Sequence, residues 1–132
     1  MDRFSASAMT HLLVVSDADA SRDWYARALD ASVYGEYGGT SVVLELLGNW
    51  LLLVTGGEPT ADKPTVTFVP PGHPDQASTE IIFRVEDCRA TYDLLRARGV
   101  VFLTEPVDWD AETRAFFRDP DGHLFEISER KG

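Results

Sequence analysis

The sequence predicts an α+β fold made of two copies of a βαβββ unit, and two observations support this prediction. The first is an internal repeat, in which an offset of 70 residues pairs Val15–Asp17 with Val85–Asp87. The second is that each copy runs from an apolar strand through an acidic helix cap into an amphipathic helix and then further strands. Duplicated units of this kind usually pair about a pseudo-two-fold axis, so we expect the site between them.

The first unit is expected over about residues 8–56. Thr10–Ser16 is its opening strand, and Ser16 or Asp17 caps a helix over Ala18–Leu29 whose apolar stripe includes Trp24. Three strands follow at 32–37, 41–47 and 50–55, with turns at Gly38-Gly39 and Gly48-Asn49.

A linker rich in Gly and Pro occupies about residues 57–79, with a candidate short strand at Val66–Val69. The second unit, about 80–130, opens with a strand at 80–85 and a helix over Cys88–Arg98, with Gly99 as the left-handed residue beyond it. Strands are expected at 100–103, 113–118 and 124–128, and Asp119-Pro120-Asp121-Gly122 forms the last turn. We treat residues 1–132 as a single domain.

Composition excludes several classes of protein. The formal net charge of −10 argues against a nucleic-acid partner and suits either a cationic ligand or a solvated acidic surface. A single cysteine, Cys88, fits a reducing cytoplasm. We find no signal peptide and no run near the roughly 18 apolar residues of a membrane span, so no membrane association is expected.

Alternation along the strands separates two faces. Leu13 and Val15 match Phe83 and Val85 as residues facing the helix of their own unit. His11 shares that parity. The opposite, concave face carries Thr10, Leu12, Val14, Glu80, Ile82 and Arg84 from the opening strands and Leu124, Glu126 and Ser128 from the last strand.

The chain resembles the glyoxalase/bleomycin-resistance/extradiol-dioxygenase group, the vicinal oxygen chelate superfamily. The resemblance rests on Val15–Asp17, Val85–Asp87 and above all the final Asp119–Glu126 segment. It implies two βαβββ modules whose mixed sheets form an open barrel around a cavity. Enzymes of the family bind a divalent metal there. Its binding members hold a drug without metal, often with two chains contributing.

The family's metal-ligand positions fall on Thr10, Glu80 and Glu126 and near Leu53, while His11 is one residue out of register. Two carboxylates form a weak site for Zn²⁺, Ni²⁺ or Fe²⁺, which favour imidazole, although Mg²⁺ or Mn²⁺ accept oxygen ligands. The resemblance therefore implies either no cofactor or one divalent metal ion of unknown identity. A strand slip or bulge is one way to turn His11 inward.

Glu126 and Glu80 are the candidate catalytic residues. In one cavity their repulsion would raise at least one pKa, providing a general acid or base or an anchor for a cation. Each alternatively forms an ion pair with Arg84 or Arg118. The candidate ligand-binding residues are Arg84, Leu12, Val14, Ile82, Trp50, Trp109, Phe116 and Arg118. His73 in the linker and His123 in the final turn are expected to be exposed.

The leading hypothesis is a cytoplasmic, homodimeric, glyoxalase/bleomycin-resistance-like protein that binds a small organic molecule, cationic by preference, in an apolar cavity. Antibiotic resistance by sequestration is the corresponding biological role. The alternative is a divalent-metal-dependent lyase, isomerase or dioxygenase of the same superfamily. A third reading is a scaffold whose own side chains fill the cavity.

Overall fold

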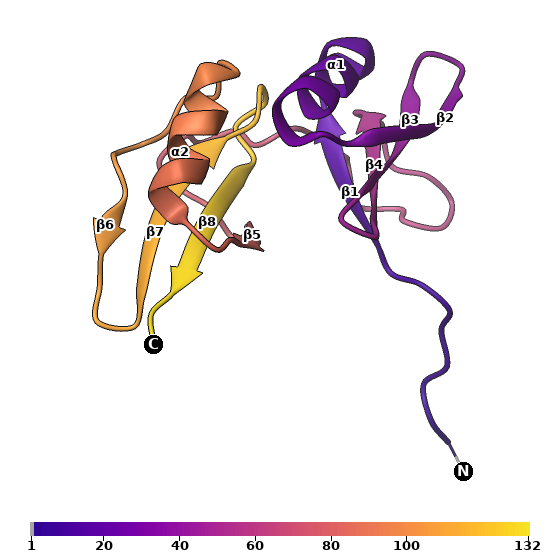
Figure 1. Cartoon of the computed structure of the whole chain (residues 1–132). Coiled ribbons are helices and arrows are strands. Elements are labelled where there is room, and N and C mark those ends of the chain that lie inside the picture. The colour runs from indigo at the N-terminus through magenta and orange to yellow at the C-terminus, as the bar shows by residue number, and fades with distance from the viewer. Residues whose placement is uncertain (1) are drawn as a thin grey trace.

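A computed structural model describes residues 2–132, and within them the chain forms two four-stranded sheets with one helix each (Figure 1). The first module contains β1 (Thr10–Val15), α1 (Ala18–Leu29), β2 (Ser32–Tyr37), β3 (Ser41–Leu46) and β4 (Asn49–Thr55). The second contains β5 (Ile81–Arg84), α2 (Cys88–Ala97), β6 (Val107–Asp108), β7 (Glu112–Arg118) and β8 (Leu124–Arg130). This order confirms the predicted α+β class and the duplicated βαβββ unit.

Both sheets have the same topology. The strand orders are β1-β4-β3-β2 and β5-β8-β7-β6, so the opening strand of each module pairs in parallel with its last strand. The remaining neighbours pair antiparallel. The two mixed sheets stay separate and are not closed into a barrel.

The two helices begin in the same way because the repeat places an aspartate at each start. Asp17 accepts a 3.0 Å hydrogen bond from the amide of Ala20, and Asp87 accepts one of 2.9 Å from Ala90. Each side chain thereby satisfies an amide that has no partner within its helix. Asp17, rather than Ser16, is thus the cap of α1.

Three local predictions differ from the structure. Residues 100–103 form only an isolated bridge at Phe102, and a short strand forms later, at β6. The expected strand at Val66–Val69 is likewise a single bridge, between Phe68 and Gly57. The β3–β4 turn is Leu47-Gly48, one residue earlier than predicted, because Leu46 pairs with Asn49. The turn and residues 66–69 are mostly exposed, so apolar burial does not fix their register. In residues 100–103, Val100 is buried and Val101 and Leu103 are exposed, so only Phe102 bridges to β7.

One hydrophobic core joins the two modules. α1 carries Trp24 and Tyr25, whose rings lie 6.4 Å from Phe117 of β7 and 6.0 Å from Phe125 of β8, respectively. Trp24 is therefore a core residue, as predicted. α1 packs on the sheet of its own module, and these rings carry its contact to β7 and β8 of the second module. The modules therefore meet through their helix-side faces.

The faces opposite the helices stay outside this core. The first open face is one side of β1, β3 and β4, and register pairing places there the apolar residues Leu12, Val14, Val43, Trp50, Leu52 and Val54 together with Thr10, Ser41 and Glu45. The second open face is defined by Ile82, Arg84, Glu112, Arg114, Phe116, Leu124, Glu126 and Ser128 on β5, β7 and β8. Phe125 and Ile127 point into the core, as the alternation of β8 predicts.

The turn before β8 fastens the second module to the first. Asp121 accepts hydrogen bonds of 2.9 and 2.6 Å from the amide and hydroxyl of Ser16, next to the start of α1. His123 Nε2 lies 2.7 Å from the carbonyl oxygen of Val14, on the free edge of β1. The predicted Asp119–Gly122 turn, with the adjacent His123, therefore helps to set the position of the second module relative to the first. Within the described residues, neither helix has the length and hydrophobicity to span a membrane.

Candidate functional site

The second open face concentrates charge around one buried carboxyl group. β8 contributes Glu126, whose Cα is paired with Ile82 on one side and Phe116 on the other. These neighbours reduce the exposure of Glu126 to 5%. The inward position predicted from strand alternation is therefore the one observed. A carboxyl group in such surroundings is costly to ionise.

The pKa of Glu126 reflects this burial. Desolvation is the largest cause, followed by a hydrogen bond with Glu80 and the negative charges of Glu80 and Glu112, and together they raise the pKa from 4.5 to about 7. The positive charge of Arg114 opposes the shift. Glu80 and Glu126 thus lie together, and a carboxyl group whose pKa lies near neutral pH suits a general acid or base.

A hydrogen-bonded chain crosses the same face beside this pair. Arg84 Nη1 donates a 2.7 Å hydrogen bond to the hydroxyl of Ser128, which in turn donates to Glu112. This second bond is the first cause of a lowered pKa of Glu112. Arg84 therefore contacts Ser128, rather than forming the ion pair with Glu80 or Glu126 that we considered from the sequence.

Arg114 lies between two aromatic rings on this face. Its guanidinium carbon is 5.1 Å from the ring centroid of Trp109 and 5.4 Å from that of Phe116. The guanidinium makes one long contact, 3.4 Å, to Glu112, and its buried Nε has no hydrogen-bonding partner in the described chain. Trp109, Arg114 and Phe116 thus form one cluster, in which two aromatic rings contact a guanidinium group.

The first open face is mostly apolar, with Glu45 as its charged residue on β3. Leu12, Val14 and Trp50, all candidate binding residues, lie on it, and the rings of Trp50 and Tyr34 meet edge to face at 4.9 Å. Where this module approaches β5, a groove of about 440 Å³ brings Trp50 together with Ile82 and Arg84. We call it the seam groove; Met9 and Leu47 also line it.

Arg118 shares the side of β7 that carries Phe116 and is paired with Leu124. Its Nη2 donates a hydrogen bond to the carbonyl oxygen of Pro74 in the linker. The side chain therefore holds the linker against β7. Its predicted place in a binding site remains a prediction.

The donor set does not fit a divalent metal. Thr10 belongs to the opposite module from Glu80 and Glu126, and His11 has the helix-side parity predicted for it. Among residues 2–132 no three His, Cys, Asp or Glu side chains are grouped to hold a metal ion. The two carboxyl groups that do meet, of Glu80 and Glu126, offer oxygen atoms and no imidazole, a poor donor set for Zn²⁺, Ni²⁺ or Fe²⁺.

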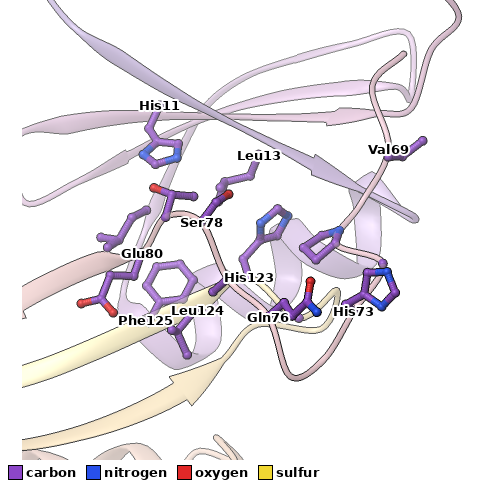
Figure 2. Close-up of a pocket in the computed structure, with 16 residues that line it drawn as sticks. His11, Leu13, Val69, His73, Gln76, Ser78, Glu80, His123, Leu124 and Phe125 are labelled. Atoms are coloured by element: carbon purple, nitrogen blue, oxygen red, sulfur yellow. The ribbon is translucent and has the colours of Figure 1, made fainter. Parts of the chain in front are cut away.

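A second cavity of about 440 Å³ lies between the modules on the linker side of Glu80 (Figure 2). We call it the histidine pocket, because His11, His73 and His123, the three histidines of the sequence, all line it. His73 is exposed, as predicted. His123 is half-buried, contrary to prediction, because its ring contacts the edge of β1.

Sequence reasoning missed Glu112 and Arg114, although both share the alternation of Phe116 along β7. The available signal was that Glu112, Arg114 and Arg118 share one parity of the strand, while Ala115 and Phe117 on the other parity are buried. The linker residues of the histidine pocket carried no comparable pattern.

Comparison with known proteins identifies the family. A model described as the Glyoxalase/Bleomycin resistance protein/Dioxygenase superfamily matches residues 8–127. The chain belongs to this superfamily. A Bacillus subtilis (strain 168) protein, the uncharacterized protein YetH, is 36% identical over 55 residues, which are 42% of this chain and 46% of that relative. The chain thus spans about half the length of this relative.

Solved structures share the fold across almost the whole chain. A glyoxalase/bleomycin resistance protein/dioxygenase from Nocardioides superposes with a TM-score of 0.76 at 20% identity, covering 98% of this chain and 86% of that one. TnmS3, an antibiotic binding protein from Streptomyces sp. CB03234, gives 0.70 at 19% identity and coverage of 98% and 100%. Lactoylglutathione lyase from Agrobacterium tumefaciens gives 0.68 at 18% identity, with 96% of both chains covered.

Proposed function

We propose that this protein binds a small, flat organic cation on the second open face, without metal chemistry. The observation that carries the proposal is the buried Glu126 carboxyl, adjacent to Glu80 and to the cluster formed by Trp109, Arg114 and Phe116. Ionised carboxyl groups attract the cationic centre, and the aromatic rings accept a flat ring system by stacking. The seam groove extends this face toward Trp50.

The family supports a binding role. The superfamily includes bleomycin-resistance proteins, and TnmS3, which shares the fold, is an antibiotic binding protein. Sequestration of an antibiotic is therefore the function we propose for this chain. The net charge of −10 adds a general attraction for cations.

We further propose that the site is completed in a homodimer in the cytoplasm. The first open face is mostly apolar and the second is charged and aromatic, so the first face of one copy is a suitable cover for the second face of its partner. Such a cover excludes water and strengthens the attraction between Glu126 and a cation. The single thiol, Cys88, is buried and suits a reducing compartment.

Binding is tested with 9-aminoacridine, a flat aromatic cation, against uncharged acridine at pH 8 by calorimetry. We expect the cation to bind at least tenfold more tightly, equivalent to about 1.4 kcal/mol. Glu126→Gln should remove this preference, and Phe116→Ala should weaken binding of both ligands. Glu86→Gln, at an exposed carboxylate outside the site, is the matched control.

The same preparation tests the metal-dependent alternative. Titration with Mn²⁺, Ni²⁺ and Zn²⁺ should give no stoichiometric binding. A stoichiometric metal that is lost in Glu126→Ala, together with failure of 9-aminoacridine to bind, would overturn the proposal in favour of an enzyme.

Light scattering after size exclusion tests the dimer. We expect wild-type protein to be dimeric, and Leu52→Asp, which places a charge in the first open face, to be monomeric with unchanged far-ultraviolet circular dichroism. A wild-type monomer that binds 9-aminoacridine fully would contradict the composite site but leave the second open face as the binding surface.

A further inference from the structure

The histidine pocket is a cavity that the proposed function does not use. It lies on the helix side of β1, roofed by linker residues 69–79 and closed at one end by Glu80 (Figure 2). Its volume of about 440 Å³ is within the roughly 300–1,000 Å³ range of small-molecule sites. Leu13, Leu124 and Phe125 supply an apolar wall.

Several polar groups of this pocket have no hydrogen-bonding partner in the part of the chain that the structure describes. The carbonyl oxygen of Val14 can only accept, so His123 Nε2 must carry the hydrogen of their 2.7 Å contact. In the neutral ring Nδ1 is then an acceptor, and within residues 2–132 it has no protein partner. The same holds for the ring nitrogens of His11, the side-chain amide of Gln76 and the hydroxyl of Ser78.

The residues that line the pocket favour an uncharged ligand. Neither lysine nor arginine lines this cavity among the described residues, so an anion would find no counter-charge. Glu80 is the single carboxylate, and it lies at the end farthest from His73, hydrogen-bonded to Glu126. Removing an ion from water is costly when no opposite charge compensates. An uncharged hydroxyl group can instead donate to an imidazole nitrogen and accept from the Gln76 amide.

We infer that the histidine pocket is a second ligand site, for a small uncharged alcohol with an aromatic or branched apolar body. The hydroxyl group lies against His123 and Gln76, and the apolar body lies against Leu13 and Leu124. This pocket meets the second open face at Leu124 and Glu80, but its polar end, at His123 and Gln76, lies outside that face. The inference does not depend on the function proposed for that face.

Three probes of equal shape and different charge test the proposal: 2-phenylethanol, 2-phenylethylamine and phenylacetate, titrated at pH 8 into isotopically labelled full-length protein. We expect 2-phenylethanol to perturb the methyl resonances of Leu13 and Leu124 and to bind at least fivefold more tightly than either ion. Ala77→Trp, on the exposed linker, should block this binding. Ser78→Ala should weaken it no more than about fivefold, the effect of one hydrogen bond.

Controls separate the two sites. Ala77→Trp should leave 9-aminoacridine binding unchanged, because Ala77 lines the histidine pocket and not the second open face. Equal affinity for all three probes, perturbation confined to Trp50 and Trp109, or unimpaired 2-phenylethanol binding by Ala77→Trp would each overturn the inference.

Discussion

The phenol of Tyr25 donates a 2.6 Å hydrogen bond to Oδ2 of Asp119, joining the helix of the first module to the last turn of the second. Tyr25 is fully buried and Asp119 is 6% exposed. Desolvation raises the pKa of both groups, and this hydrogen bond opposes the rise at Asp119. The repeat is not exact at this contact, because the position in α2 that corresponds to Tyr25 is Leu95. The polar contact between α1 and the turn before β8 therefore has no counterpart at Leu95.

The first prediction is that Tyr25→Phe destabilises the protein by about 1–3 kcal/mol at pH 7, because it removes the donor from a buried carboxylate. The decrease in the free energy of unfolding should be smaller at pH 4, because a larger fraction of Asp119 is then protonated and does not need a hydrogen-bond donor. Urea unfolding at both pH values measures the difference. Tyr34→Phe, at a 70% exposed ring, is the control and should leave stability within about 0.5 kcal/mol of wild type.

The second prediction concerns stability and pH through Glu126. Its pKa is about 7 in the folded protein against an ordinary 4.5, so the folded state binds the proton more tightly than the unfolded state. Stability from this group is therefore greatest below pH 4.5 and falls as pH rises toward 7. Glu126→Gln should remove that fall, making the variant more stable than wild type at pH 8 by on the order of 1–3 kcal/mol.

Thermal melts from pH 5 to pH 8 compare Glu126→Gln with wild type and with Glu86→Gln. Parallel curves for wild type and Glu126→Gln would show that burial does not hold the proton on Glu126. The cation affinity should follow the opposite course, rising from pH 6 to pH 8 as Glu126 loses its proton.

A third prediction uses two neighbours of opposite charge. Arg114 favours the ionised form of Glu126 and Glu112 disfavours it. Arg114→Met should therefore raise the pKa of Glu126 above that of wild type, and Glu112→Gln should lower it. Carbon-13 detection of the Glu126 carboxyl resonance follows the titration directly. Shifts of the same sign in both variants would contradict this account, since rearrangement rather than charge would then dominate.

Strand alternation predicted which way Glu126 points because β8 has a large pair, Phe125 and Ile127, on the other parity. Burial of that pair fixes the register of β8, and the side chain of Glu126 must then point to the opposite side of the sheet. The helix caps followed from Asp17 and Asp87 for an equally local reason. These parts of the fold and of the site depend on a few neighbouring residues and were therefore predictable.

Contacts between the modules were not predictable in the same way. His123 follows a turn of polar residues, and its half-buried position depends on the free edge of β1, 109 residues earlier in the chain. Arg114 sits between Trp109 and Phe116 because β6 and the following turn bring Trp109 over β7. Neither contact produces a periodic pattern in the sequence from which it could be predicted.

The fourth prediction concerns strain at the seam groove. The two-residue turn Leu47-Gly48 has positive φ at both positions, 53° and 76°, as a type I′ turn requires. Leucine is poorly suited to this region, whereas asparagine tolerates it. Leu47→Asn should therefore stabilise the protein by about 1 kcal/mol in urea unfolding.

Leu47 is 76% exposed, so the substitution loses little apolar burial. Val101→Asn, at a 78% exposed residue outside any such turn, should give no stabilisation. Because Leu47 lines the seam groove, Leu47→Asn should at the same time weaken 9-aminoacridine binding by removing an apolar wall. A strained apolar residue retained at a ligand groove is the pattern expected when binding, rather than folding, determines the side chain. Stabilisation without any loss of affinity would mean that the strain serves no part of the binding site.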